Sequence, residues 1–239
     1  MKLDLLRRLQ AAREAKRPVA LLTRLPDGAQ LLFPEDATPA ALADAARAAI
    51  LADAARNVAT DDETWFVEPH NPPLRLIVVG AVHIAQALVP MALPLGFAVT
   101  VVDPRRAFAT EERMGGRVAI STDWPDEAMA ALAPDARTAV VTLTHDPKLD
   151  DPALEVALRS EAFYVGSLGS RRTHAKRLAR LTEAGLTEAQ LAKIHAPVGL
   201  DIGAVTAPEI AVSILAQIVE ARRGGPRKKP SAERQEASA

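Results

Sequence analysis

The stretch LRLIVVG at residues 74–80 decides the fold, because it is an apolar run, interrupted only by Arg75, that ends in glycine. Such a run is typical of a strand buried on both faces of a parallel sheet. We expect a strand over 74–79, a helix over about 84–95, and a second strand over 98–102 that ends at Asp103. These elements have the length of one βαβ unit, which predicts a parallel sheet.

Strands and helices continue to alternate toward the C-terminus. Apolar runs predict strands over 139–143 and 162–165, and the intervals predict helices over 126–132, 152–160, 171–184 and 208–222. Alternating strands and helices indicate the α/β class. The sequence therefore predicts a Rossmann-like, doubly wound parallel sheet.

The residues before this sheet predict a small N-terminal α+β segment. Its expected elements are a helix over 3–16, strands over 19–23 and 30–33, a helix opened by Thr38 and Pro39 that reaches about 51, and a strand over 64–67. Three prolines within residues 68–73 remove backbone donors, so we expect neither strand nor helix to continue there. The predicted divisions are 1–70, 71–224 for the Rossmann-like domain, and 225–239 for a polar, disordered tail.

Composition excludes several classes of protein. The formal net charge of the 239 residues is -1, which argues against a dedicated nucleic-acid binder. The chain has no cysteine, so disulfides, thiol nucleophiles and cysteine-bound metals are excluded, and sulfur transfer would need a partner's cysteine. No apolar run reaches the roughly 18 residues of a membrane span. We expect a cytoplasmic protein that does not enter a membrane.

The turn after the first strand resembles part of a dinucleotide-binding fingerprint. That fingerprint has glycine at its first, third and sixth positions, and here only Gly80 matches strictly, with Ala85 as an accepted small residue. Val82 stands where the second glycine lets the backbone approach a pyrophosphate. His83 at the helix start is either a phosphate donor or a capping residue.

An acidic residue at the end of the second strand is the next candidate. Asp103 lies where the fingerprint has the carboxylate that binds a ribose hydroxyl, and Arg105 follows it closely. An arginine fork binds phosphate through two hydrogen bonds, so this segment suits a ribose phosphate or another anion. A salt bridge within the loop is the alternative.

The Gly/Ser loop before the helix at 171–184 predicts an anion site. Backbone N–H groups at a helix N-terminus attract anions, and glycines let a ligand approach. Hydroxyl and guanidinium donors accompany them. The candidate residues are Gly166, Ser167, Gly169, Ser170 and Arg171. The alternative is an ordinary helix cap.

Two further loops supply candidates. Thr206 and Glu209 form a capping box, whereas Gly199, Asp201 and Gly203 serve either a ligand or tight turns. The pair His145 and Asp146, after the strand at 139–143, is either an acid/base pair or a hydrogen-bonded loop. All these segments follow the carboxyl ends of strands, where open α/β sheets bind their ligands.

Five stretches in this order resemble the XdhC/CoxI family of accessory proteins for xanthine dehydrogenase. They are LIVVGAVHIAQAL, VTVVDPRRAFATEER, TLTHDPKLDDPAL, FYVGSLGSRRTHAKRL and IHAPVGLDIGAVTAPEIAVSILAQIVEARRG. They cover roughly residues 74–224, which corresponds to the family's C-terminal Rossmann domain.

The resemblance implies a non-catalytic chaperone that binds the molybdenum cofactor (molybdopterin). Such a chaperone protects the cofactor during sulfuration by a cysteine desulfurase and inserts it into a xanthine dehydrogenase-type molybdoenzyme. The resemblance also implies a homodimer. The family's N-terminal Gly-Ser-(Ser/Thr/Ala)-Pro-Arg and Gly-Gly-Cys/Gly-Leu-Glu segments do not occur in residues 1–70. We therefore expect a separate XdhC N-terminal-type protein to supply them.

Two other readings of the same residues stay open. In one, the chain is an NAD(P)-dependent oxidoreductase with Asp103 on the ribose and His145 as acid/base, although Val82 counts against it. In the other, the chain is an adaptor that uses the Rossmann scaffold without a ligand. The sequence predicts no metal ligands of the protein's own.

Overall fold

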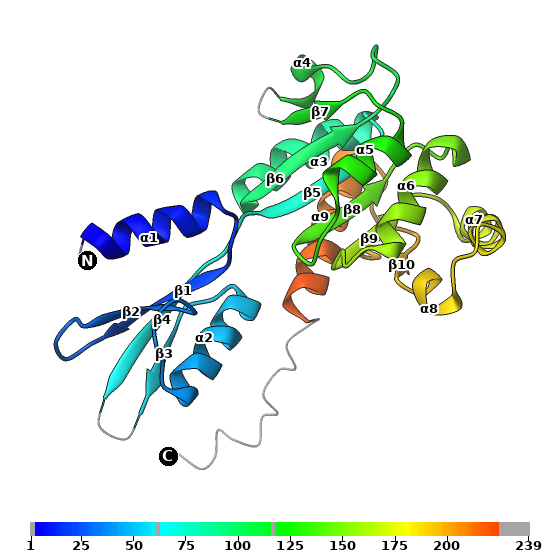
Figure 1. The fold of residues 1–239 in the computed structure, drawn as a ribbon. Coiled ribbons are helices and arrows are strands. Elements are labelled where there is room, and N and C mark those ends of the chain that lie inside the picture. The colour runs from blue at the N-terminus through cyan, green and yellow to red at the C-terminus, as the bar shows by residue number, and fades with distance from the viewer. Residues whose placement is uncertain (1–2, 61–62, 116–117, 225–239) are drawn as a thin grey trace, which may run out of the picture. The chain divides into compact units, whose positions relative to one another are not determined.

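The computed structural model of the chain describes residues 3–60, 63–115 and 118–224 (Figure 1). The tail predicted over 225–239 lies outside the described residues. The chain divides between Pro72 and Pro73 into two compact units, and each unit has its own hydrophobic core.

The N-terminal unit is an antiparallel sheet of four strands with two helices. Its elements are α1 (Leu3–Glu14), β1 (Val19–Arg24), β2 (Gln30–Phe33), α2 (Ala40–Ala52), β3 (Arg56–Ala59) and β4 (Thr64–His70), and the strand order is β2-β1-β4-β3. Alternation along β1 sends Ala20 and Leu22 into a cluster with α2, and Val19 and Leu21 into a cluster with α1. The helices therefore cover opposite faces of the sheet.

Three details of this unit differ from the sequence prediction. The strand β4 continues through Pro69 to His70, whereas a break was predicted. Pro69 lies opposite Ala20 of β1, whereas β3 pairs only with residues 64–67 of β4. The edge of β4 that faces away from β1 is therefore unpaired at Pro69, and no backbone N–H is needed there for a hydrogen bond to β3. The short strand β3 was not predicted. Thr38 does not cap α2, because its Oγ1 donates to the Asp36 carbonyl and Pro39 holds the N-cap position.

The second unit carries a six-stranded parallel sheet. Its strands are β5 (Leu74–Val79), β6 (Phe97–Val102), β7 (Ala119–Ser121), β8 (Thr138–Thr142), β9 (Tyr164–Ser167) and β10 (Ile194–His195). They lie in the order β10-β9-β8-β5-β6-β7, and each adjacent pair is parallel. When these six are numbered along the chain, the order is that of the doubly wound nucleotide-binding fold. The predicted Rossmann-like α/β class is therefore confirmed.

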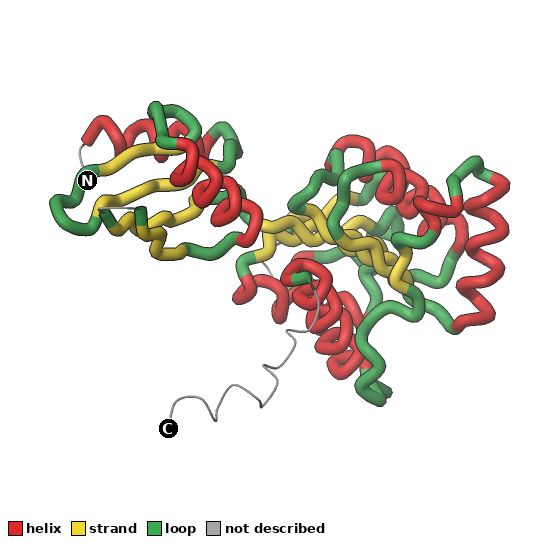
Figure 2. The backbone as a smooth tube through the Cα atoms, turned by 90° about the horizontal axis from the view of Figure 1, so that it is seen from below, coloured by secondary structure: helices red, strands yellow, loops and turns green. Residues whose placement is uncertain are grey.

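Helices cover both faces of this sheet (Figure 2). The first face is covered by α3 (His83–Ala92), with the 3-10 turn η1 (Leu93–Leu95), α4 (Glu111–Met114) and α9 (Ala207–Arg223). The second is covered by α5 (Pro125–Leu132), α6 (Pro147–Arg159), α7 (Arg171–Glu183) and α8 (Glu188–Leu191). In β5, Leu76 and Val78 enter the first core while Ile77 and Val79 enter the second. This double burial explains why residues 76–79 of β5 are all apolar.

The sequence prediction was incomplete for the short elements. It missed α4, β7, α8 and β10, which have two to four residues each and show no measurable periodicity. The helix predicted over 152–160 begins at Pro147, because Asp146 caps it and Pro147 needs no hydrogen-bond partner at the first helical position. Pro152 lies inside this helix.

The strand order reverses between β5 and β8, and Gly80 lies at this switch point. The Gly80 N–H donates to Val102 of β6, and its φ of 108° is disfavoured for other residues. A Cβ at position 80 would lie 2.6 Å from Thr144 Cγ2 in the segment after β8. Glycine is required here for both conformation and close packing.

We predict that Gly80→Ala lowers the free energy of unfolding by about 2–4 kcal/mol, from backbone strain and overpacking together. The matched control is Gly96→Ala, because Gly96 has a φ of 84° but open space around its Cβ position. The control isolates the backbone cost of about 1–2 kcal/mol. Denaturant unfolding measures both variants, and equal losses would contradict the close packing at Gly80.

Candidate functional site

The parallel sheet brings the predicted site segments to one edge. Gly80 follows β5, Asp103 follows β6, Gly166 lies in β9, and the loop with Gly199 follows β10. Each of these strands is parallel to its neighbours, so their carboxyl ends lie at the same edge of the sheet. The structure thus gathers these segments, while the ligand roles of their residues remain predictions.

Asp103 is buried and ties the ends of two strands together. Its Oδ2 accepts from the Ala81 N–H at 2.8 Å and from Arg105 Nη2 at 2.8 Å. Its Oδ1 accepts from Arg105 Nε at 2.9 Å and from the Arg105 N–H at 3.0 Å. Four donors from the chain itself therefore occupy both carboxylate oxygens, and the side chain is 0% exposed. In this conformation Asp103 fixes the turn after β5 relative to the end of β6.

The ionised form of Asp103 is favoured despite its burial. Desolvation raises the pKa of this carboxyl, but the hydrogen bonds from Arg105 and Ala81 outweigh it and hold the pKa below its usual value. The guanidinium of Arg105 also lies 4.8 Å from the ring centroid of Phe108. Arg105 is thus held by two kinds of contact, an ion pair and a cation–π interaction.

The start of α3 has no side-chain cap. Val82 occupies the N-cap position with extended dihedrals, and no side-chain hydrogen bond is made there. Its side chain packs against the hydrophobic core, where the usual glycine would leave space. His83 is the exposed first residue of α3. His83 therefore does not hold the N-cap position, and its phosphate role remains a prediction.

The Gly/Ser loop after β9 divides into structural and accessible parts. Ser167 is buried, and its Oγ lies 2.6 Å from Oγ1 of Thr142 in β8. Ser170 is the N-cap of α7, with its Oγ accepting from the Thr173 N–H at 3.2 Å. The predicted helix-cap role thus exists, and it leaves the exposed Arg171 as the candidate anion ligand of this loop.

Gly166 and Gly199 are required for close packing. A Cβ on Gly166 would lie 2.6 Å from Val198 Cγ2, so this glycine lets the following loop rest on β9. A Cβ on Gly199 would lie 2.3 Å from Ser213 Oγ of α9, and its φ is 96°. In contrast, Gly203 has a φ of 74° and open space around it. Gly203 is therefore a turn glycine at an accessible position.

Gln217 of α9 anchors the loop that contains Gly199. Its Oε1 accepts from the Gly199 N–H at 2.9 Å and from the Tyr164 hydroxyl at 2.6 Å. Burial raises the pKa of Tyr164, so the phenol stays a donor. The Tyr164 ring also stacks on His195 at a centroid distance of 4.7 Å. The loop is therefore held by a partly buried polar network as well as by glycine contacts.

These contacts form a cavity of about 400 Å³ beside the N-terminus of α9, which we call the Gly199 cavity. It is bounded by Leu168 and Arg171 before and at the start of α7, by residues 197–204, and by Ile210 and Ser213 of α9. The cavity thus joins two segments that the sequence singled out separately, the loop around Gly169 and the loop with Gly199, Asp201 and Gly203. Its volume falls within the range of small-molecule sites.

His145 and Asp146 lie apart from this cavity, at the start of α6. Asp146 is the N-cap of α6, and its Oδ1 accepts from the Lys148 N–H at 2.9 Å. His145 has a φ of 61° and lines a different cleft, between α6 and α7. The predicted hydrogen-bonded loop therefore exists, and among the described residues no hydrogen bond joins the side chains of His145 and Asp146.

Sequence reasoning missed several buried polar residues of this edge. They are Asp150, Tyr164 and Arg177, and it also missed the partly buried Gln217, which is hydrogen-bonded to Tyr164. Helical spacing offers one usable signal, because Arg177 lies one turn before the buried Leu181 on the same face of α7. A charged residue on a buried face marks a polar contact that strand and turn patterns do not show.

The Rossmann domain model of XdhC matches residues 76–218. The chain belongs to the XdhC family. It is 33% identical over 162 residues to the Escherichia coli K12 protein YqeB, covering 67% of this chain and 30% of YqeB. It is also 33% identical over 151 residues to PaoD of the same organism, a molybdenum cofactor insertion chaperone, covering 63% of this chain and 41% of PaoD. The chain thus spans less than half the length of these relatives.

A solved structure shows the same fold. A xanthine dehydrogenase of Bacillus halodurans aligns with a TM-score of 0.72 and 24% identity, covering 92% of this chain and 67% of that chain. At this identity the likeness concerns the fold alone. Among the described residues, no helix is long and apolar enough to cross a membrane.

We predict that Asp103→Asn lowers the free energy of unfolding at pH 7 by about 1–3 kcal/mol, because it removes the charge of a buried carboxylate that is paired with the exposed Arg105 and sets an amide N–H₂ against donors. The folded pKa of Asp103 lies below its unfolded value. The stabilisation is therefore present above about pH 4 and is lost as the pH falls through the folded pKa.

Denaturant unfolding between pH 7 and pH 3 measures this effect. The difference between the native chain and the variant should shrink at the acidic end. Asp201→Asn is the control, because Asp201 is an exposed carboxylate of the same unit. A difference that does not depend on pH would contradict the assigned role of the ionised carboxylate.

Proposed function

We propose that the chain binds the molybdenum cofactor in the Gly199 cavity and assists its insertion into a xanthine dehydrogenase-type molybdenum hydroxylase. Membership of the XdhC family and the likeness to PaoD support this function. The single structural observation that carries the site is the union of Arg171 with the loop of residues 197–204 around one cavity. The proposal includes a homodimer that acts as a holder of the cofactor, not as an enzyme.

The residues present at the Gly199 cavity fit a ligand that combines a planar polar ring with a phosphate. Arg171 supplies a fixed positive charge, and the first N–H groups of α7 have no partner within the helix. Leu168 and Ile210 supply apolar walls, and the open space at Gly203 lets a ligand approach the backbone. The cofactor supplies molybdenum for the target enzyme, while these residues would bind and shield it.

The absence of cysteine bears on the sulfuration step. The chain contains no thiol that accepts or donates sulfur. Under the proposal, a cysteine desulfurase delivers the sulfur directly to the bound cofactor, and the chain contributes only binding and orientation. The desulfurase and the target molybdoenzyme are the two partners that the proposal requires.

The oxidoreductase reading has less support. The carboxylate of Asp103 is fully used by donors of its own chain, so a ribose hydroxyl would have to displace Arg105 or Ala81. Val82 stands where the fingerprint has the glycine that lets the backbone approach a pyrophosphate. We therefore expect NAD(H) and NADP(H) to bind weakly.

We predict that the full chain retains molybdenum cofactor under anaerobic conditions with a Kd in the micromolar range or tighter. Arg171→Ala should weaken retention at least tenfold, because a charge-assisted hydrogen bond is worth about 1.5–3 kcal/mol. Molybdenum content and pterin fluorescence after gel filtration measure retention. Lys193→Ala removes an exposed positive charge elsewhere in the same unit and is the control.

Two outcomes would contradict the proposal. One is tight binding of NAD(H) or NADP(H) without retention of the cofactor. The other is cofactor retention by Arg171→Ala at the level of the native chain and the Lys193→Ala control, which would place the ligand outside the Gly199 cavity.

A further inference from the structure

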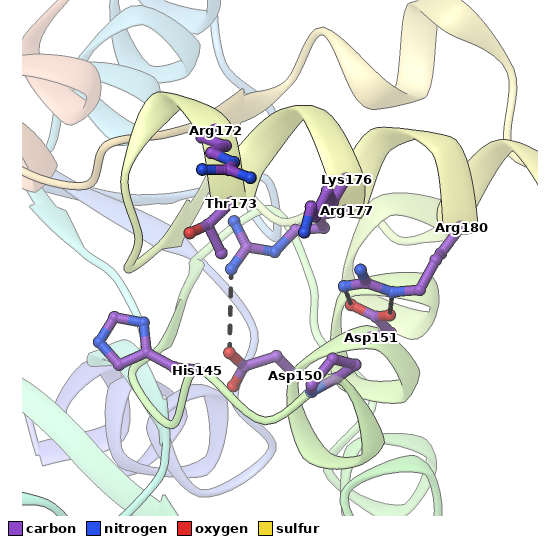
Figure 3. Close-up of a pocket in the computed structure, with 9 residues that line it drawn as sticks. His145, Asp150, Asp151, Arg172, Thr173, Lys176, Arg177 and Arg180 are labelled. Carbon is purple, nitrogen blue, oxygen red and sulfur yellow. Dashed lines mark hydrogen bonds and ion pairs between the residues drawn. The ribbon is translucent and has the colours of Figure 1, made fainter.

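A second cleft, of about 330 Å³, lies between α6 and α7 (Figure 3). We call it the α6–α7 cleft, and its lining residues are His145, Pro147, Asp150, Asp151, Arg172, Thr173, Lys176, Arg177 and Arg180. The helical repeat places residues 172, 176 and 180 on one side of α7, so three cationic side chains follow one another along the cleft. Neither the family match nor the proposed cofactor cavity assigns a role to this cluster.

The two acidic residues of the cleft, Asp150 and Asp151, neutralise only one of these three cations. Arg180 is matched by Asp151, with Nη2 and Oδ1 3.0 Å apart. The exposed side chains of Arg172 and Lys176 have no ion pair in the part of the chain that the structure describes. Positive charge therefore remains in excess at the mouth of the cleft.

Arg177 at the inner wall is an incompletely satisfied buried cation. It is 2% exposed, and its Nη2 donates to the Leu168 carbonyl at 2.8 Å. The same Nη2 lies 3.9 Å from Asp150 Oδ2, which is too long for a hydrogen bond. Among the described residues, Arg177 Nε and Nη1 and Asp150 Oδ2 have no hydrogen-bond partner. Figure 3 shows the guanidinium reaching across the cleft from α7 toward Asp150.

Unpaired buried N–H groups of a cation are costly, and a bound anion is one of the partners that satisfy them in natural proteins. Burial lowers the pKa of Arg177 and raises that of Asp150, which is the effect expected when neither charge has a strong partner. Free guanidinium donors with a neighbouring lysine and a helix N-terminus match the oxygens of a phosphate group. Thr173 at the same helix start adds a hydroxyl to this set.

We propose that the α6–α7 cleft binds a phosphate group, with Arg172, Lys176 and Arg177 as its cationic ligands. The group is the phosphate of the bound cofactor or that of a separate small molecule. This inference does not rest on the proposed function, because it follows from the charges and unpaired donors of the cleft.

Inorganic phosphate is the probe, and the full chain is the sample. Isothermal titration calorimetry should show millimolar or tighter binding to the native chain, with a loss of at least tenfold in Arg172→Ala/Lys176→Ala. Both positions are exposed, so this variant should fold normally. Arg7→Ala/Lys193→Ala removes two exposed charges elsewhere and should bind like the native chain.

Arg177→Lys tests the inner wall, because lysine keeps the charge but loses the fork. It should also weaken phosphate at least tenfold, with thermal unfolding as the check on folding. If no binding is detected at phosphate concentrations up to about 20 mM, which is about 20 times a millimolar Kd, the proposal is overturned. Equal binding by the native chain and the Arg172→Ala/Lys176→Ala variant would do the same.

Competition distinguishes the two sources of phosphate. If the cofactor's own phosphate occupies the cleft, inorganic phosphate displaces bound cofactor and the Arg172→Ala/Lys176→Ala variant loses cofactor as well. If a separate molecule occupies it, phosphate binds equally to the free and cofactor-loaded chain. Both results support the phosphate site, and phosphate binding to the free chain supports it even where cofactor retention fails.

Discussion

The carboxylate of Asp103 is the contact on which the site edge depends. It lies buried after β6 and joins Ala81, in the turn after β5, to Arg105 in its own loop. Because β5 is central in the sheet and borders the switch point, this contact fixes where α3 begins relative to the neighbouring strands. These hydrogen bonds also engage both carboxylate oxygens of Asp103, at the position where the carboxylate of a dinucleotide-binding fold accepts from a ribose hydroxyl. The ion pair between the buried Asp103 and the exposed Arg105 thus stabilises the turn after β5.

The start of α7 separates the two hollows of this edge. Arg171 lines the Gly199 cavity, whereas Arg172 and Thr173 line the α6–α7 cleft. Glycines and the Gln217 network hold the far wall of the first hollow, and the Arg177–Asp150 pair forms the inner wall of the second. A rigid helix end with cationic residues on both sides is well suited to ligands that carry phosphate.

The long strands and helices were predictable because burial of their apolar side chains sets the pattern of their sequences. The apolar run of β5 reflects burial on both faces, and the glycine after it reflects the close approach of Thr144. The buried polar residues were not predictable in the same way. Gln217 meets Tyr164 of β9, and Arg177 faces Asp150 of α6, and only the folded chain brings these residues together. The strand break predicted at Pro69 was wrong for a similar reason. Whether β4 can contain a proline there depends on where the pairing with β3 ends, and the sequence does not show this.

The most direct test of the account is a crystal structure of the full chain with bound molybdenum cofactor. The account predicts the pterin in the Gly199 cavity, in contact with Arg171 and the loop of residues 197–204. It also predicts that Asp103 keeps its hydrogen bonds to Ala81 and Arg105. A cofactor bound instead against Val82, with Asp103 released from Arg105, would contradict the central claim that this edge binds its ligand at α7 and α9.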